Sequence, residues 1–171
     1  MKSGSAPSER RIVFFRHGAA EPSQPGDDDA RRRLTSEGRE KTALAARGLA
    51  KILQGEPKIL SSPYSRAAET ARLLREALGG QVSLDLVNAL APGLTVEGLL
   101  AAIRSIHSEV IIVVGHAPDL NDIMGTLIAI RGDGVDGVRK AGACAIRLRA
   151  DGSATLEWFV TPQILRALGR E

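Results

Sequence analysis

The sequence predicts an α/β fold, a three-layer α/β/α sandwich whose mostly parallel sheet ends in a C-terminal antiparallel hairpin. Short apolar segments alternate with segments of helical periodicity over most of the chain. The segment 110–114 is apolar at every residue, which is typical of a parallel strand covered by helices on both faces. Near the C-terminus, two alternating segments are joined by Asp151 and Gly152, a dipeptide that favours a hairpin turn.

The first half of the chain is expected to hold two strands and two helices. An apolar strand at 11–15 precedes a polar loop that runs to residue 33 and contains prolines and charged runs. Thr35 can cap the first helix, which a glycine and a proline end. After a short strand at 58–61, Ser62 and Pro63 suit the N-cap and first position of a second helix.

The second half follows the same alternation. Gly79 and Gly80 end the second helix. Residues with apolar side chains then recur at helical spacing twice more, once before and once after the buried strand. The expected elements are a minor strand at 81–84, a helix over 96–103, the strand at 110–114, a helix opened by Pro118, a glycine-rich loop at 132–142, strands at 143–149 and 154–160, and a short C-terminal helix.

Length and composition predict one domain. The chain has 171 residues, of which 43 % are hydrophobic and 25 % charged, as in ordinary globular proteins. We expect residues 1–10 to form a polar leader and residues 11–171 a single domain. Because no apolar run approaches the roughly 20 residues of a membrane span, we expect neither a signal peptide nor an anchor, and a cytoplasmic location. The absence of a heptad pattern makes a monomer the default expectation.

The net charge and the amino-acid composition limit the kinds of partner that the protein can be expected to bind. With Cys144 as the sole cysteine, an intramolecular disulfide and a cysteine-clustered zinc site are excluded. A net charge of +3 and a pI near 9.4 fit either a polyanionic partner or a site for phosphate. Only 3 % of residues are aromatic, which argues against a base-stacking surface for nucleic acid. We therefore expect no nucleic acid, no membrane, no metal and no cofactor.

The candidate site lies where predicted strands end. His17 follows the first strand and His116 follows the strand at 110–114, and ligands of open α/β sheets bind beyond the carboxyl ends of strands. Arg66 is expected in or just after the first turn of the second helix. There the helix dipole disfavours a cation unless an anion is bound nearby. These residues together indicate a phosphate site.

Each of these signals also has an ordinary structural explanation. Arg-His-Gly occurs often by chance, and a histidine at a strand end is commonly hydrogen-bonded to backbone. Arg66 could be a surface arginine, and the segment 115–118 could be a tight turn. The combination favours function, because two arginines and two histidines are expected at one edge of the sheet.

The same residues resemble the histidine phosphatase superfamily, whose fold is phosphoglycerate-mutase-like. Within it, the short chain and small C-terminal hairpin resemble the bacterial phosphohistidine phosphatases. The resemblance implies that His17 attacks phosphorus, and that Arg16, Arg66 and His116 bind the phosphoryl oxygens without a metal. The motifs that carry it are Phe14-Phe15-Arg16-His17-Gly18, Leu34 to Gly38, Ser61 to Thr70, and Val114-Gly115-His116.

The sequence departs from the wider superfamily at the general acid. Mutase-like members carry a glutamate in the stretch that here reads 86–92 without a carboxylate, and acid phosphatases carry an aspartate where Ala117 stands. Asp119 is two positions late, and whether Asp119, Glu97 or no side chain donates a proton stays open. Because an alkoxide needs that proton to leave, we expect phosphohistidine or another labile donor to be preferred.

Other candidates and other functions are kept as alternatives. Ser23 could bind phosphate, because family members often place a small polar ligand near that position. The arginines at 31–33 could steer an anionic substrate, although we favour a solvated face that balances the aspartates at 27–29. The leading function is a phosphatase acting on phosphohistidine of signalling proteins. A small-molecule phosphomonoesterase and a non-catalytic phospholigand-binding module are the alternatives.

Overall fold

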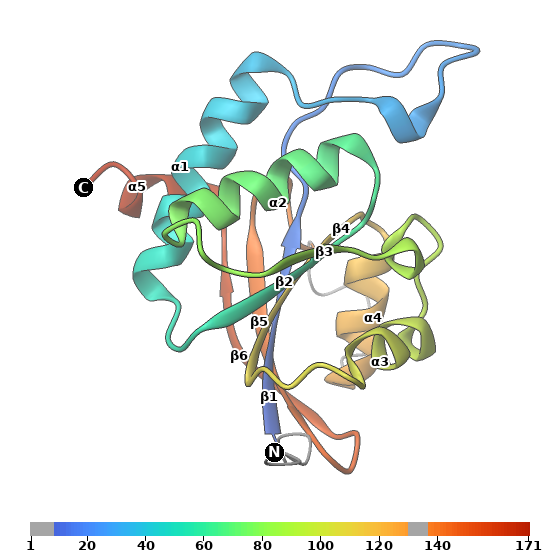
Figure 1. Cartoon of the computed structure of the whole chain (residues 1–171), viewed down its shortest axis with the longest axis vertical. Coiled ribbons are helices and arrows are strands. Elements are labelled where there is room, and N and C mark those ends of the chain that lie inside the picture. The colour runs from blue at the N-terminus through green and yellow to red at the C-terminus, as the bar shows by residue number, and fades with distance from the viewer. Residues whose placement is uncertain (1–8, 130–136) are drawn as a thin grey trace.

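The computed structural model describes residues 9–129 and 137–171, and it has one six-stranded sheet between two layers of helices (Figure 1). In chain order the elements are β1 (Glu9–Arg16), the 3-10 helix η1 (Asp29–Arg31), α1 (Ser36–Ile52), β2 (Pro57–Ser61), α2 (Ser65–Ala77), β3 (Leu84–Leu86), the 3-10 helix η2 (Asn88–Leu90), α3 (Val96–Ile103), β4 (Val110–Gly115), α4 (Asp119–Leu127), β5 (Ala143–Arg149), β6 (Ala154–Val160) and α5 (Pro162–Leu168).

The sheet topology confirms the predicted α/β class. The strand order is β3-β2-β4-β1-β5-β6, with the first four strands parallel, β5 antiparallel to β1, and β6 antiparallel to β5. Arg16 of β1 is in register with Gly115 of β4, and Ser61 of β2 with Val114. The carboxyl ends of these three strands therefore meet at one edge of the sheet.

Two apolar cores lie on opposite faces of the sheet. Successive side chains of a strand point to opposite faces, so Ile12 and Phe14 enter one core while Val13 and Phe15 enter the other. The first core is covered by α3 and α4, and the second by α1, α2 and α5 (Figure 1). All four side chains are fully buried. This explains why β1 is apolar on consecutive residues rather than alternating.

Several predicted boundaries differ from the structure. The strand β1 begins at Glu9, two residues inside the predicted leader. The minor strand β3 lies at Leu84–Leu86 rather than at 81–84. The prediction that Ser62 caps α2 is wrong, because the helix begins at Ser65 and its N-cap is Tyr64. Parts of the predicted leader (1–8) and of the glycine-rich loop (132–136) lie outside the described residues.

The C-terminal hairpin and the third helix agree with the sequence prediction. The strands β5 and β6 have the predicted bounds, and the turn between them includes Asp151 and Gly152. Gly152 has a φ of 84°, which a glycine adopts without strain.

None of the described helices is long and apolar enough to span a membrane.

Candidate active site

The fold brings His17 and His116 together although they are far apart in the sequence. His17 directly follows β1 and His116 directly follows β4, and the backbone N–H of His17 donates to the carbonyl of Gly115 at 3.1 Å. The two imidazole rings are tilted by 55° with centroids 5.2 Å apart. Both rings are buried, with exposed fractions of 7 % for His17 and 4 % for His116. The predicted pair of histidines therefore shares one site.

Arg16 and Arg66 belong to the same site. Arg66 is the second residue of α2, and its guanidinium carbon lies 5.1 Å from the ring centroid of Tyr64. The Tyr64 ring is in turn 5.3 Å from the His116 ring. The positive charges of Arg16 and Arg66 act on both histidines and disfavour their protonation. The four residues predicted to be catalytic, which are Arg16, His17, Arg66 and His116, therefore lie near one another.

His17 has the geometry of a nitrogen nucleophile. Its Nδ1 lies 2.7 Å from the carbonyl oxygen of Gly18, so we assign the ring proton to Nδ1 and the free lone pair to Nε2. Burial, and then the charges of His116, Arg66 and Arg16, lower the pKa of His17 to about 3, against the opposing effect of that hydrogen bond. At neutral pH the ring is uncharged and Nε2 can attack phosphorus.

The segment after His17 is fixed to α2 through Thr70. The Gly18 N–H donates to the Thr70 hydroxyl at 3.1 Å, and that hydroxyl donates to the Arg66 carbonyl at 2.7 Å. A Cβ at Gly18 would collide with the hydroxyl of Thr42, so a side chain does not fit there. Thr70 therefore couples the nucleophile to the helix that carries Arg66, a role that sequence reasoning did not assign.

His116 is held by Ser62 at the end of β2. The Nε2 atom of His116 lies 2.8 Å from the Ser62 hydroxyl, which also accepts from the Tyr64 N–H at 3.3 Å. We therefore assign the Ser62 O–H as donor to Nε2, which leaves a proton on Nδ1. The hydroxyl that the sequence suggested as a helix cap instead orients a site histidine.

His116 is buried, and burial opposes the protonation of its ring. Burial, followed by the charge of Arg66, lowers the pKa of His116 to about 4, although the charges of Asp119 and Asp29 oppose this. His116 is therefore neutral at pH 7 in the free protein. A bound phosphate would favour the cationic form of His116, because its negative charge would raise the pKa of the ring.

Buried donors without partners gather at this site. Within the part of the chain that the structure describes, six buried side-chain polar atoms make no hydrogen bond, and three of them are Arg16 Nε, Arg66 Nε and His116 Nδ1. A buried unsatisfied donor typically costs about 1–3 kcal/mol. A tetrahedral oxyanion offers acceptors to all three, so the arrangement suits phosphate.

Arg66 is bound to the loop that precedes α1. Its two terminal nitrogens donate to the carbonyl of Asp29 at 2.7 Å and to the Asp29 carboxylate at 2.9 Å. The favoured interpretation of the aspartates and arginines as a solvated face is correct for the exposed Asp28–Arg31 pair and wrong for Asp29. No sequence pattern reveals this contact, because it joins residues 37 positions apart.

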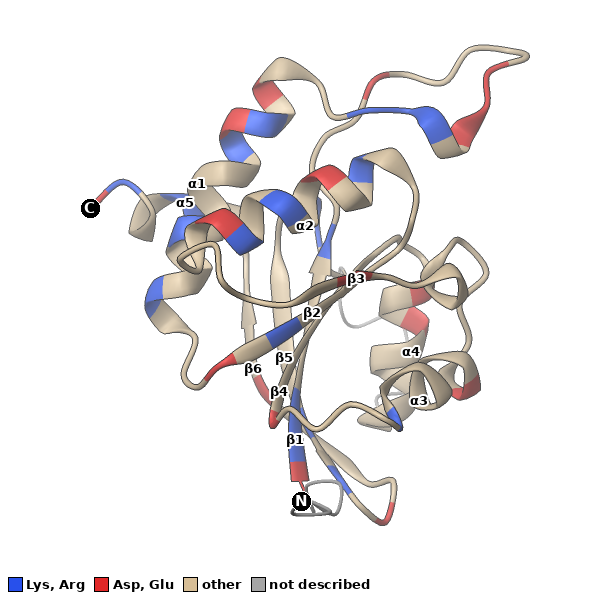
Figure 2. Cartoon of the chain, in the orientation of Figure 1, with Lys and Arg blue, Asp and Glu red and all other residues tan. Residues whose placement is uncertain are grey.

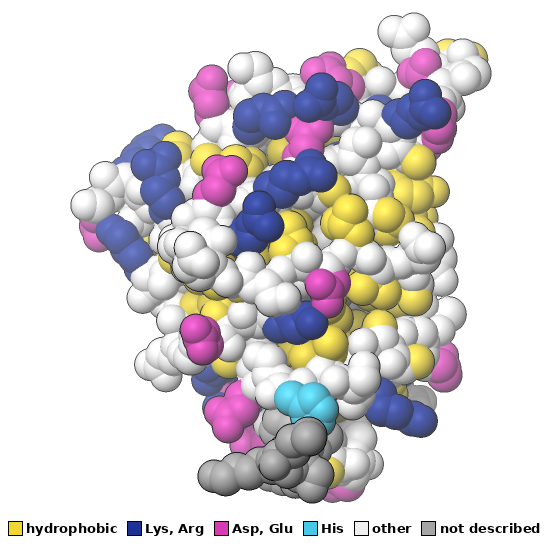
Figure 3. Space-filling view, viewed as in Figure 1, with side chains coloured by type: hydrophobic (Ala, Val, Ile, Leu, Met, Phe, Trp, Pro, Cys, Tyr) yellow, Lys and Arg dark blue, Asp and Glu magenta, His cyan; other side chains and the backbone are white. Residues whose placement is uncertain are grey.

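A second ion-paired cluster fixes the same loop to the helices. Glu69 of α2 is buried, and its two carboxylate oxygens each lie 2.8 Å from an arginine nitrogen, of Arg33 and of Arg39. On the face drawn in Figure 3, lysine and arginine side chains lie interspersed with acidic ones around α1, α2 and this loop. Arg33 and Arg39 therefore already have a carboxylate partner.

Within the part of the chain that the structure describes, the remaining candidates make no hydrogen bond to His17 or His116. Ser23 is exposed in the loop after β1, and among residues 9–129 and 137–171 no hydrogen bond joins it to the site, so its role stays a prediction. Asp119 begins α4, accepts from the Gly93 N–H at 2.8 Å and acts on His116 through its charge. Glu97 is exposed in the first turn of α3. In the described residues no three His, Cys, Asp or Glu side chains form a cluster that could hold a metal ion.

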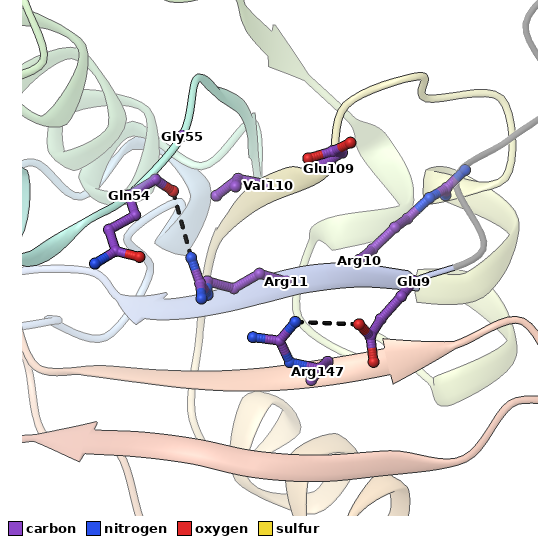
Figure 4. Close-up of a pocket in the computed structure, with 8 residues that line it drawn as sticks. All are labelled: Glu9, Arg10, Arg11, Gln54, Gly55, Glu109, Val110 and Arg147. Carbon is purple, nitrogen blue, oxygen red and sulfur yellow. Dashed lines mark hydrogen bonds and ion pairs between the residues drawn. The ribbon is translucent and has the colours of Figure 1, made fainter.

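A second hollow, of about 500 Å³, lies at the opposite edge of the sheet (Figure 4). Arg11 binds Glu157 and donates to the Gln54 carbonyl, and Arg147 binds Glu9 and Glu157. These arginines have carboxylate partners in place, unlike Arg16, for which no ion pair is seen within the described residues. Of the arginines that line the hollow, Arg11 and Arg147 are ion-paired, whereas Arg10 keeps a buried Nε atom without a hydrogen bond in the described structure.

Comparisons with known proteins agree with this geometry. The model of the histidine phosphatase superfamily (branch 1) matches residues 12–91. An uncharacterized protein of Picosynechococcus sp. (strain ATCC 27264 / PCC 7002 / PR-6) is 30 % identical over 151 residues, which cover 82 % of this chain and 90 % of the relative.

Solved structures with the same fold are more distant in sequence. The protein histidine phosphatase SixA, complexed with tungstate, has a TM-score of 0.78 at 22 % identity, over 91 % of this chain and 99 % of that one. Phosphoglycerate mutase from Bacillus anthracis has a TM-score of 0.75 at 18 % identity, over 96 % of this chain and 98 % of that one. The phosphoglycerate-mutase-like fold predicted from the sequence is thereby confirmed.

Proposed function

Because the chain belongs to the histidine phosphatase superfamily, we propose that it is a phosphatase that carries the phosphoryl group on His17 and removes it from phosphohistidine of signalling proteins. The observation that carries the proposal is the pairing of a neutral, oriented His17 with three buried donors that lack acceptors. A nucleophile and an oxyanion site in contact are the requirements for phosphoryl transfer through an enzyme intermediate.

The first chemical step uses both features. Nε2 of His17 forms a bond to phosphorus while the bond to the leaving group breaks, and the Nδ1–H bond to the Gly18 carbonyl holds the ring in line. Charge on the transferred group spreads over its oxygens, where Arg16, Arg66 and Nδ1 of His116 can donate. In the second step, water attacks the phosphohistidine and releases inorganic phosphate.

The choice of substrate follows from the missing proton donor. Residues 86–92 hold no carboxylate, and Ala117 follows His116. An imidazole that is protonated on its other nitrogen leaves without a further proton, whereas an alkoxide does not. The fold similarity to SixA, which is named a protein histidine phosphatase, supports the same choice. We propose further that the reaction needs no metal and takes place in the cytoplasm, on a monomer.

One observation favours the second candidate, a small-molecule phosphomonoesterase. The carboxylate of Asp119 is close enough to His116 to raise its pKa, so a proton donor for an ester leaving group could be supplied from α4. A non-catalytic binding module is the third candidate. The oriented ring of His17 argues against a binding module, because binding alone does not require a free Nε2.

Phosphate release from a phosphohistidine-bearing phosphotransfer protein, measured beside a panel of alkyl phosphate esters with chelator present, tests the proposal. We expect turnover of phosphohistidine, slow turnover of the esters, and loss of activity in His17→Ala. Fast ester hydrolysis would identify the phosphomonoesterase, and no turnover of either substrate would leave the binding module.

A further inference from the structure

Asp29 binds Arg66, one of the arginines of the candidate phosphate site. Arg66 donates from its two terminal nitrogens to the backbone carbonyl and to one carboxylate oxygen of Asp29. The other carboxylate oxygen accepts from Arg32 at 2.9 Å. Both oxygens therefore have a fixed partner, and the carboxylate keeps its place although its side chain is 47 % exposed.

The carboxylate of Asp29 is ionised and its charge reaches the catalytic site. Burial opposes ionisation, but the hydrogen bond and charge of Arg66, followed by the charge of Arg32, outweigh burial and lower the pKa of Asp29. Asp29 also raises the pKa of His116, as Asp119 does from α4. An ionised carboxylate cannot donate a proton, so Asp29 must act on the reaction through its negative charge.

A negative charge at this place weakens the attraction of the site for an anion. The backbone carbonyl of Asp29 already binds Arg66, and a neutral amide side chain could accept the second hydrogen bond without repelling phosphate. Figure 2 shows acidic residues on the loop that carries Asp29 and at the start of α4, where Asp119 lies. The added negative charge therefore favours a bound substrate that carries a compensating positive charge.

Resting on the phosphatase function above, we propose that Asp29 is a specificity-determining residue that selects N-phosphorylated substrates, whose leaving group is cationic while still bonded to phosphorus. A phosphoimidazole protonated on its second ring nitrogen has this charge, and so does a protonated phosphoramidate. Substrates that bear a second phosphate or a carboxylate near the scissile bond are repelled by Asp29 and Asp119.

The proposed transfer of the phosphoryl group to His17 needs no further reactant. Nε2 of His17 bonds to phosphorus, the P–N bond breaks, and its electron pair returns to the departing nitrogen. The imidazole leaves neutral, because its other nitrogen keeps the proton that it carried. The Asp29 carboxylate favours the protonated ring before the bond breaks, so no proton donor is needed. This agrees with the absence of a carboxylate from residues 86–92.

Two variants at neighbouring positions separate the effect of the Asp29 charge from the effect of its hydrogen bonds to Arg66. Asp29→Asn keeps a hydrogen-bond acceptor for Arg66 and removes the charge. Asp28→Asn is the matched control, because it removes a charge from the same loop while an asparagine oxygen can still accept from the Ala30 N–H. Asp28 pairs with the exposed Arg31 rather than with Arg66. The substrates are a phosphohistidine peptide and p-nitrophenyl phosphate, whose leaving group carries no positive charge.

We expect Asp29→Asn to lower kcat/KM for the phosphohistidine peptide about tenfold and to leave that for p-nitrophenyl phosphate unchanged or raised. The alkaline limb of the phosphohistidine pH profile should move to lower pH in this variant, and Asp28→Asn should behave as wild type. An equal loss on both substrates would overturn the proposal and make Asp29 a support for Arg66. A wild-type protein that does not hydrolyse the phosphohistidine peptide would overturn the proposed function itself.

Discussion

Arg11 at one edge of the sheet differs from Arg16 and Arg66 at the other edge in whether its Nε atom has an acceptor. At the amino edge, Arg11 and Arg147 both bind Glu157. Arg147 also binds Glu9 (Figure 4). At the carboxyl edge, Arg16 and Arg66 each keep a buried Nε atom without a hydrogen bond in the described structure.

The difference separates arginines that stabilise the fold from arginines that bind a ligand. A guanidinium whose Nε already donates to a carboxylate, as that of Arg11 does, gains little from a further anion, and its loss is felt in folding. A buried donor without an acceptor destabilises the free protein, and its loss is felt in binding and catalysis. Variants at the two edges should therefore fail in different assays.

The largest expected effect is the loss of catalysis in Arg66→Ala. Removal of one donor to the transferred phosphoryl group should reduce kcat roughly 100-fold to 1,000-fold. Steady-state kinetics on phosphohistidine gives the rate, and circular dichroism shows whether the variant is folded. Arg11→Ala at the amino edge is the control and should keep the wild-type kcat. A folded Arg66→Ala variant with nearly full activity would contradict the distinction between the edges.

The pH dependence of stability should come largely from the carboxyl edge. The pKa values of His17 and His116 fall to about 3 and about 4, so below their unfolded value of 6.5 the unfolded chain binds more protons than the folded one. The free energy of unfolding should then fall as the pH drops from 6.5 toward 4, by on the order of 1 kcal/mol per pH unit for each histidine.

Denaturant unfolding at several pH values checks this dependence. His116→Asn should flatten the curve between pH 4 and 6.5. His107→Asn removes an exposed histidine and should keep the wild-type curve. A similar slope in all three proteins would mean that the buried histidines do not determine acid stability.

For Glu157→Gln we expect a smaller effect, which lowers stability and leaves catalysis unchanged. This carboxylate accepts from Arg11 and Arg147, and the hydrogen bond and charge of Arg11 lower the pKa of Glu157. The variant should lose about 1–2 kcal/mol of stability, a figure reduced by solvent screening, while kcat stays unchanged. Denaturant titration and steady-state kinetics on the same sample measure both, and a drop in kcat without a change in stability would be the unexpected result.

The smallest effect is expected at the periphery of the amino edge. Arg149 is exposed, and its nitrogen lies 3.6 Å from the Glu9 carboxylate. Arg149→Ala should change the free energy of unfolding by less than about 0.5 kcal/mol. A loss as large as that of Glu157→Gln would show that the whole ion-paired network acts as one unit.

The sequence predicted the fold class, and it predicted that two arginines and two histidines lie together at one edge of the sheet, because each lies in or next to an element with a clear pattern. His17 and His116 follow apolar strands, and parallel strands bring their carboxyl ends to one edge. Arg66 is at the start of a helix, as predicted, although that helix begins two residues later than an N-cap at Ser62 suggested. Periodicity and strand order were sufficient for this part of the site.

The contacts that orient these residues could not be predicted in the same way. Ser62 binds His116, Thr70 binds Gly18, and Asp29 binds Arg66, and each pair joins segments far apart in the chain. Hydrophobic periodicity reports which face of an element is buried and carries no information on which polar side chains meet across loops. The aspartates at 27–29 look alike in the sequence, and only the third contacts a site residue.

The central claim is that His17 carries the phosphoryl group, and trapping that intermediate tests it most directly. The protein would be mixed with a phosphohistidine substrate, denatured within one turnover under alkaline conditions that preserve phosphohistidine, and digested for mass spectrometry. The account predicts one phosphoryl group on the peptide that contains His17, and none in His17→Ala. A phosphoryl group on another residue, or turnover with no phosphorylated peptide, would contradict it.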